Sequence, residues 1–220
     1  MSSFEQLSEK LDEGYLYGMQ KNIMEATNSW NDAWRVFIAL VDENGSKTLE
    51  DFDSMVNGNM YVRNWVMDLE RLLQEATKID FNYHKLIIKI CSEYLKRFDD
   101  TGAEDVTQLY RISFCASLFA LGEESKSEEY YKLWLKKDPN WTAGWLGWSD
   151  CWIKFTEVTK KDLKNAASIL NLALEEKSQR GGKTAIYDKL IWIYEKLKDK
   201  EMIEKVKMLK KDTWGEELSE

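Results

Sequence analysis

Apolar residues recur every three or four positions along most of the chain, which is the spacing of one face of an α-helix. The pattern predicts a long first helix over residues 4–26 and a second helix that begins at Ser29, with Asp32 at capping-box distance. An Asn-Gly pair predicts a turn at residues 42–47. Pro139 is the single proline, so few residues would interrupt helices. The pattern therefore predicts an all-α fold.

The same spacing predicts further helices before residue 100. Thr48 would cap a short helix that continues to Val56, a longer helix would carry residues 62–76, and another would follow Asp80. The polar stretch 99–105 is the candidate boundary between two lobes, although it is too short for a true linker. We therefore expect an N-terminal helical lobe at 1–102, helical hairpins at 103–214 and an acidic tail at 215–220, with both lobes in one continuous domain.

Residues 108–141 have the length and pattern of a tetratricopeptide repeat, a pair of antiparallel helices of 34 residues. Phe114 would lie in the first helix, Gly122 in the turn, Tyr131 in the second helix, and Pro139 at its end. A second unit follows if about five extra residues are allowed near 156–161. A third, degenerate unit would follow the Gly-Gly pair at 181–182.

The chain thus resembles the tetratricopeptide superfamily over residues 108–212, about half of its length. Residues 138–150, with Phe52 and residues 64–70, are also similar to poorly characterised bacterial tetratricopeptide-like proteins. Some of those carry a cysteine-rich, metal-binding SEC-C motif at the C-terminus, which is absent here because residues 210–220 contain no cysteine. The resemblance implies antiparallel helical hairpins stacked as a short right-handed solenoid, beside an N-terminal helical lobe.

Charge and cysteine content exclude several classes of partner. The formal net charge is −8, with acidic and basic residues mixed along the chain, so we expect no nucleic-acid partner. Cys91, Cys115 and Cys151 are far apart and form no C-x-x-C pair, which predicts neither disulfides nor a zinc site. No apolar stretch is long enough to span a membrane. We expect a cytoplasmic protein without a membrane partner.

No group of residues forms a recognisable catalytic centre. His84 is the only histidine, and no nucleophile motif accompanies it. Residues 181–184 read Gly-Gly-Lys-Thr, but the first glycine of a phosphate-binding loop and the preceding strand are missing. Carboxylate pairs at 99–100, 123–124 and 216–217 lie at expected turns and helix ends, where solvent and the helix dipole favour them. The sequence predicts no catalytic residue, cofactor or metal, and therefore no enzyme.

Tryptophan is unusually frequent, with ten residues in the chain. Trp141, Trp145, Trp148 and Trp152 follow one another at steps of four, three and four, which places them on one stripe of a helix. Trp145 and Trp152 fall at repeat positions that pack against the second helix of the hairpin, so we expect both in the core. Trp141 and Trp148 are open to either interpretation: core packing, or contact with a partner.

The resemblance implies that the first helix of each hairpin lines a concave face on which a partner lies. The leading hypothesis is a non-enzymatic adaptor that binds a protein or peptide. The alternatives are a structural module that forms homo-oligomers such as a homodimer, and a ligand-sensing domain with a pocket between the two halves. The predicted partner-binding residues are Trp148, Asp150, Lys154, Lys189, Trp192 and Lys196. Other positions mapped to this face are Ile112, Ala116, Phe119, Leu146, Ile153 and Asp188.

Overall fold

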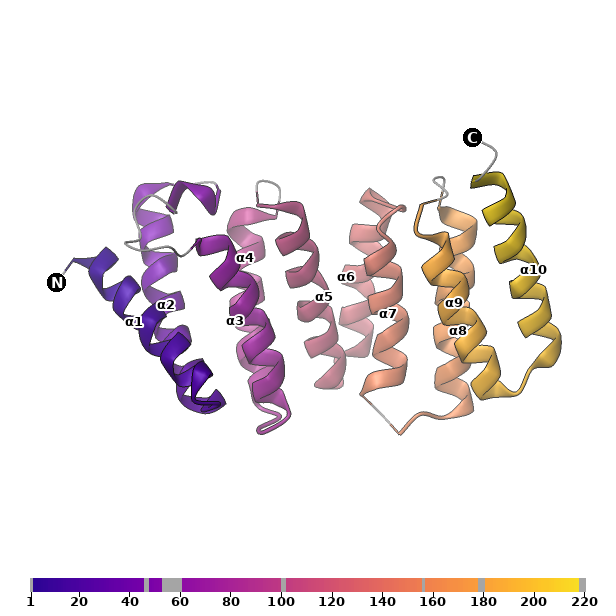
Figure 1. Ribbon diagram of the computed structural model, residues 1–220, viewed down its shortest axis with the longest axis horizontal. Coiled ribbons are helices and arrows are strands. Elements are labelled where there is room, and N and C mark those ends of the chain that lie inside the picture. Colours follow the sequence, from indigo (N-terminus) through magenta and orange to yellow (C-terminus); the bar gives the residue numbers. More distant parts are fainter. Residues whose placement is uncertain are drawn as a thin grey trace. The chain divides into compact units, whose positions relative to one another are not determined.

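The computed structural model describes residues 2–45, 48–52, 61–99, 102–155, 157–177 and 181–217, with side chains up to residue 213. Within these residues the chain forms ten α-helices, one short 3-10 helix and no strand, which confirms the predicted all-α class (Figure 1). The elements in chain order are α1 (Ser3–Met19), α2 (Ile23–Asn44), η1 (Glu50–Phe52), α3 (Val62–Thr77), α4 (Tyr83–Phe98), α5 (Glu104–Ala120), α6 (Glu124–Lys137), α7 (Thr142–Lys154), α8 (Lys160–Glu176), α9 (Lys183–Leu197) and α10 (Lys200–Glu217).

The chain divides into two compact units, unit 1 (Met1–Ser117) and unit 2 (Leu118–Glu220). The division lies inside α5, beyond the polar stretch at 99–105 where the sequence predicts a boundary. Helices that follow one another pack together: α1 on α2, α2 on α3 and α3 on α4 in unit 1, and α6 through α10 in order in unit 2. Each unit is therefore built from adjacent antiparallel helix pairs, as Figure 1 shows.

The first two helices begin and end at residues other than those predicted. The chain turns after α1, where Lys21 takes a left-handed conformation (φ 59°), and Asn22 caps α2. Ser29 is a buried residue inside α2 whose hydroxyl donates to the Lys10 carbonyl over 2.9 Å. The predicted helix start at Ser29 is therefore wrong. Apolar spacing continues across the turn, so periodicity alone does not reveal the single left-handed residue that separates the helices.

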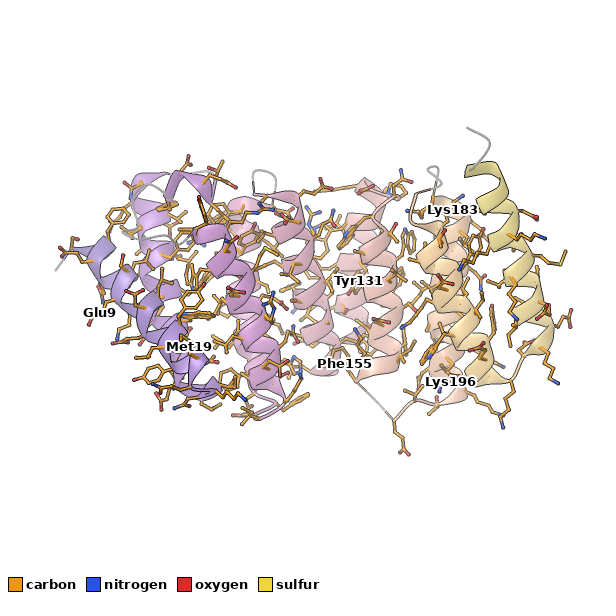
Figure 2. The ribbon with its side chains drawn as sticks, viewed as in Figure 1. Glu9, Met19, Tyr131, Phe155, Lys183 and Lys196 are labelled. Atoms are coloured by element: carbon orange, nitrogen blue, oxygen red, sulfur yellow. The ribbon has the colours of Figure 1, made fainter. Side chains whose placement is uncertain are left out.

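Aromatic side chains fill the core of unit 1. Phe37 lies at its centre, with ring centroids 5.1 Å from Phe52, 5.6 Å from Trp65 and 6.3 Å from Phe98. The Trp34 indole is fully buried and donates to Glu93 Oε2 over 2.7 Å. Apolar burial and ring contacts of this kind give the packing its specificity. Figure 2 shows the side chains that occupy the space between the helices.

The short helix predicted at 48–56 is described only in part. The Thr48 hydroxyl accepts a hydrogen bond from the Asp51 amide over 3.3 Å, and the Asp51 carboxylate accepts one from the Thr48 amide over 3.1 Å. This reciprocal pair stands at the start of η1, so Thr48 does serve as the cap of a helical turn. Residues 53–60, which would complete the predicted helix, lie outside the described residues.

The tryptophan stripe of α7 forms much of the core of unit 2. Trp141, Trp145 and Trp148 are each 4% exposed, which settles the two open positions in favour of packing. Trp145 donates from Nε1 to the Pro139 carbonyl over 2.9 Å and stacks on Trp148 with ring centroids 6.1 Å apart. The prediction that Trp145 packs in the core is confirmed. Trp152 is only half-buried, so the same prediction is met in part for it.

The turns between the helices of unit 2 match residues singled out in the sequence. Gly122, between α5 and α6, has φ 81°, a conformation that side chains other than glycine rarely adopt. Gly182 precedes α9 with φ 79°. Thr159 caps α8 in a capping box with Asp162, so of the extra residues predicted near 156–161, residues 157–159 lead into this helix and residues 160–161 begin it.

Two glycines one turn apart on α1 are expected to respond oppositely to substitution by alanine. A Cβ at Gly14 would lie 2.0 Å from Trp30 Cδ1 and Nε1, and that indole is held by its hydrogen bond to the Leu11 carbonyl. Gly14→Ala should therefore lower the free energy of unfolding by about 1–3 kcal/mol. Gly18 has open space around it, so Gly18→Ala should raise that free energy by up to about 1 kcal/mol. Urea denaturation of both variants measures the contrast, and equal effects would contradict the packing of Trp30 against α1.

Candidate functional site

Five of the six residues predicted to bind a partner come together in unit 2, on two helices that contact each other. Asp150 and Lys154 lie one turn apart on α7. Lys189, Trp192 and Lys196 follow one another on α9 at steps of three and four, which places them on one face of that helix. Since α7 packs against α9, the two faces meet. We call these five residues the Trp192 cluster; Lys183 and Lys196 mark the two ends of α9 in Figure 2.

Ion pairs and cation–π contacts join the cluster into one network. The Asp150 carboxylate lies 2.8 Å from Lys154 Nζ and 2.6 Å from Lys189 Nζ, so it links α7 to α9. The Lys189 ammonium is also 5.0 Å from the centroid of the Trp192 ring, and the Lys196 ammonium is 5.6 Å from it. Both distances lie within the range at which a cation is attracted to an aromatic face.

The exposed parts of the cluster are the indole and two of the ammonium groups. Trp192 is 38% exposed, which is unusual for so large an apolar side chain. The Lys154 side chain is 62% exposed, whereas Asp150 and Lys189 keep only 21% and 27% of theirs. Three lysines stand against one aspartate, so the cluster is locally positive in a chain whose formal net charge is −8. The surface therefore presents the Trp192 indole ring, with lysine ammonium groups beside it that can donate hydrogen bonds.

Trp148, the sixth predicted residue, does not belong to the cluster. It is 4% exposed, and its ring stacks on Tyr131 with centroids 6.0 Å apart. The Lys132 ammonium lies 5.5 Å from its centroid. Its spacing on α7 matched the partner-binding face as well as the core face, and contacts with α6 decide between them. Trp148 therefore packs against α6, and its part in partner binding stays a prediction.

The remaining positions mapped to the binding face are mixed in exposure. Phe119 is 3% exposed, and its ring meets Trp152 edge-on with centroids 5.1 Å apart. Leu146 and Ile153 are half-buried on α7. Asp188 is exposed on α9 and pairs with Lys210 of α10. Ile112 and Ala116 belong to unit 1, so they lie outside the cluster of unit 2 described above.

Two titratable side chains of unit 1, His84 and Glu70, are buried in its core. His84 Nδ1 lies 3.1 Å from the hydroxyl of Ser117, which is fully buried, and burial lowers the pKa of His84. Glu70 accepts hydrogen bonds from the Ser113 hydroxyl and, over 2.9 Å, from Gln74 Nε2. Burial raises the pKa of Glu70 above its usual range. A serine beside a histidine and a buried carboxylate are elements of acid–base chemistry, and here their hydrogen bonds satisfy polar groups that packing has buried.

The three cysteines are buried, and burial raises the pKa of the Cys91 thiol well above its ordinary value and that of Cys151 to about 12. In the described parts of the chain, no group of three or more histidine, cysteine, aspartate or glutamate side chains is arranged to hold a metal ion. Among the helices described, none combines the length and apolar character needed to cross a membrane.

Comparison with known proteins identifies no family. No protein-family model matches the chain, and no match is found among curated proteins. The described residues thus form an all-helical arrangement of adjacent antiparallel helix pairs, with the Trp192 cluster across α7 and α9.

Proposed function

We propose that the protein is a non-enzymatic adaptor that binds a protein or peptide on the Trp192 cluster. In this proposal the helix pairs are tetratricopeptide-like repeats stacked as a right-handed solenoid, and α7 and α9 are the first helices that line its concave face. The observation that carries the proposal is Trp192, an exposed tryptophan with two lysine ammonium groups within cation–π distance of its ring.

An exposed tryptophan that is already ordered suits partner binding. Tryptophan supplies a large contact area and is enriched among residues that contribute most binding energy. Lys189 is fixed by its ion pair with Asp150, so the ring beside it is held at little further entropic cost when a partner binds. A single exposed apolar side chain is common on protein surfaces and needs no functional explanation. Trp192 differs because an ion-paired lysine lies beside its ring, and this favours a binding role.

The charges of the cluster indicate the chemistry of the partner. Lys154 and Lys196 are exposed on two helices: Lys196 lies beside the indole ring, and Lys154 pairs with Asp150. A segment that places carboxylates on these lysines and an apolar or aromatic side chain on the Trp192 ring would match the surface. A phosphate backbone carries a charge on every nucleotide, so the net charge of −8 opposes it more strongly than it opposes a short acidic segment. The proposed partner is therefore an acidic protein segment.

The test is capture from a lysate of the source organism by immobilised protein. Trp192→Ala and Lys154→Glu should each lose the same subset of captured proteins, because both side chains belong to the proposed surface. Their free energies of unfolding should stay within about 0.5 kcal/mol of wild type, since both side chains are exposed. Thermal melts check this second expectation.

Matched controls separate the cluster from the rest of the surface. Leu133→Ala removes another exposed apolar side chain, on α6, and Lys164→Glu reverses another exposed lysine, on α8. Both should retain every captured protein. The proposal is wrong if the Trp192 and Lys154 variants retain them all as well, or if the control variants lose the same subset.

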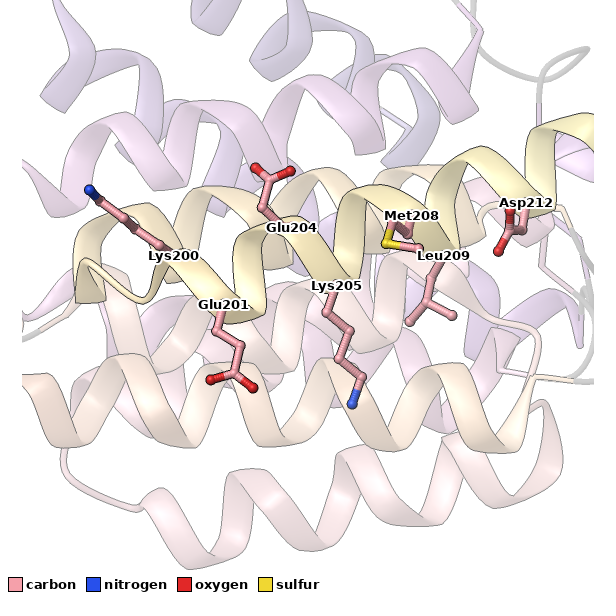
Figure 3. Close-up of a pocket in the computed structure, with 7 residues that line it drawn as sticks. All are labelled: Lys200, Glu201, Glu204, Lys205, Met208, Leu209 and Asp212. Carbon is pink, nitrogen blue, oxygen red and sulfur yellow. The ribbon is translucent and has the colours of Figure 1, made fainter.

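The outer face of α10 favours a second candidate, a module that forms homo-oligomers. A hollow of about 600 Å³ is lined by seven residues that all come from this one helix, as Figure 3 shows. Met208 and Leu209 are 67% and 42% exposed there. Because only one helix lines this hollow, it cannot enclose a small molecule. The exposed apolar side chains Met208 and Leu209, with charged residues on either side, could instead pack against a second copy of the chain.

Light scattering distinguishes the two candidates. A dimer that becomes monomeric on Met208→Glu, while capture through the Trp192 cluster is absent, would favour the oligomerising module. A monomeric wild-type protein would remove this second candidate.

A further inference from the structure

The outer face of α10 has an apolar centre with opposite charges on its two sides. The helix packs against α9, and Val206 is only 2% exposed, whereas Met208 and Leu209 are 67% and 42% exposed. Lys205 lies one turn before this apolar pair, and Asp212 lies one turn after it, as Figure 3 shows. A cation and a carboxylate therefore stand at equal distances along the helix from the same apolar centre.

The two charges beside the apolar pair have no partner of their own. Within the part of the chain that the structure describes, neither Lys205 nor Asp212 forms an ion pair, although Lys207 of the same helix pairs with Glu204 at 3.0 Å. Both unpaired side chains are exposed. Lys205 and Asp212 are therefore free to pair with charges of another molecule.

This arrangement is complementary to itself. When two copies of α10 pack antiparallel about a twofold axis between Met208 and Leu209, each Met208 faces the other copy's Leu209, and each Lys205 faces the other copy's Asp212. Lys205 and Asp212 are seven positions apart, about two turns, so both lie on the same side of the helix. A parallel pairing would instead bring Lys205 onto Lys205 and Asp212 onto Asp212. The charges thus favour one orientation and one register.

The other carboxylate near the centre does not oppose this register. Packed helices cross at about 20–50°, so contact is confined to the central turns, residues 204–213, and the helix ends diverge. In that segment Glu204 stands opposite Thr213 of the second copy, which carries no charge. The central contact therefore contains the apolar pair and the attractive pairs of Lys205 with Asp212, and no like-charge pair directly opposite.

We propose that two copies of the chain pair through the outer face of α10 in an antiparallel homodimer, with Met208 on Leu209 and Lys205 on Asp212 of the other copy. The inference rests on the second candidate function, the module that forms homo-oligomers, and adds the register and the ion pairs that specify it. No residue of the Trp192 cluster lies on α10, so the adaptor proposal does not depend on it. A contact between single helices is small for a specific interface, so the dimer should be weak and should form with increasing concentration.

The test is sedimentation of the full chain from about 10 μM to about 1 mM, a range that covers a weak dimer. Lys205→Glu and Asp212→Lys should each weaken self-association at least about tenfold, because each change turns both ion pairs into like-charge contacts. An equimolar mixture of the two variants should dimerise at least as readily as wild type. In the mixed dimer the two introduced charges attract each other, and the native Lys205 of one variant meets the native Asp212 of the other. Native mass spectrometry with one variant labelled with ¹⁵N identifies that mixed dimer.

Lys207→Glu is the matched control, because it changes the charge of the same helix by the same amount at a residue that does not line this face. It should self-associate like wild type. The proposal is overturned if Lys207→Glu weakens the dimer as much as Lys205→Glu does, or if the mixture of Lys205→Glu and Asp212→Lys stays monomeric. Circular dichroism checks that each variant is folded, as expected for changes at exposed side chains.

Two further outcomes separate this inference from the proposed functions. A wild-type dimer that Lys205→Glu leaves intact would overturn the α10 pairing and leave the oligomerising module standing through another surface. A wild-type protein that is monomeric at every concentration, whether α10 stays uncovered or meets a different protein, would overturn both. Neither outcome bears on capture through the Trp192 cluster, which the lysate experiment measures separately.

Discussion

Trp145→Ala is expected to lower the free energy of unfolding by about 3–5 kcal/mol, the loss typical of truncating a buried tryptophan. Trp145 is 4% exposed and stacks on Trp148, so its removal leaves a cavity in the core of unit 2. The Pro139 carbonyl also loses the indole N–H that bonds it at 2.9 Å. A loss of this size is a large part of the stability of an ordinary domain, about 5–15 kcal/mol.

Urea denaturation followed by circular dichroism measures this loss. Trp152→Ala is the informative comparison: its side chain is half-buried, so its loss should be smaller than that of Trp145→Ala. Trp192→Ala, which removes a tryptophan that is 38% exposed, should unfold within about 0.5 kcal/mol of wild type. A Trp145→Ala protein as stable as wild type would show that the packing of α7 described above is wrong.

Lys177→Glu is expected to lower the free energy of unfolding of the protein by about 3–5 kcal/mol, the loss that follows when a buried charge has no partner. Lys177 is 4% exposed at the end of α8, and burial lowers its pKa. Its ammonium donates to the Asn140 carbonyl over 2.8 Å and to Thr142 Oγ1 over 2.6 Å. The carboxylate introduced by this substitution would face the Asn140 carbonyl oxygen, which cannot donate a hydrogen bond to it.

Lys177→Met is the matched control, because it keeps an unbranched apolar stem and removes the charge. It should cost only about 1–3 kcal/mol, the penalty for leaving the Asn140 carbonyl without its donor. The difference between the two variants should shrink as the pH falls towards and below the ordinary pKa of glutamate, since the protonated acid is uncharged and can donate to that carbonyl. Equal stability of the two variants at pH 7.5 would show that residue 177 is hydrated.

Helix content was predictable because it depends on local spacing. Apolar residues three and four apart fix one face of a helix whatever packs against it, and the near absence of proline leaves the backbone hydrogen bonds intact. Helix ends were less predictable. Lys21 separates α1 from α2 by a single left-handed residue, and lysine is common in helix interiors, so the local signal of the break is the cap residue Asn22. Ser29 could thus be mistaken for a cap although it is buried in α2.

For the candidate site, the sequence by itself determined which residues share a helix face. Lys189, Trp192 and Lys196 lie on one side of α9 by spacing alone, and Asp150 and Lys154 on one side of α7. Only the tertiary structure decided that Asp150 pairs with Lys189 across the two helices and that Trp148 is covered by Tyr131 and Lys132. The physical reason is that a helix repeats every 3.6 residues, so its faces follow from the sequence, whereas the neighbour that covers each face depends on how helices distant along the chain pack.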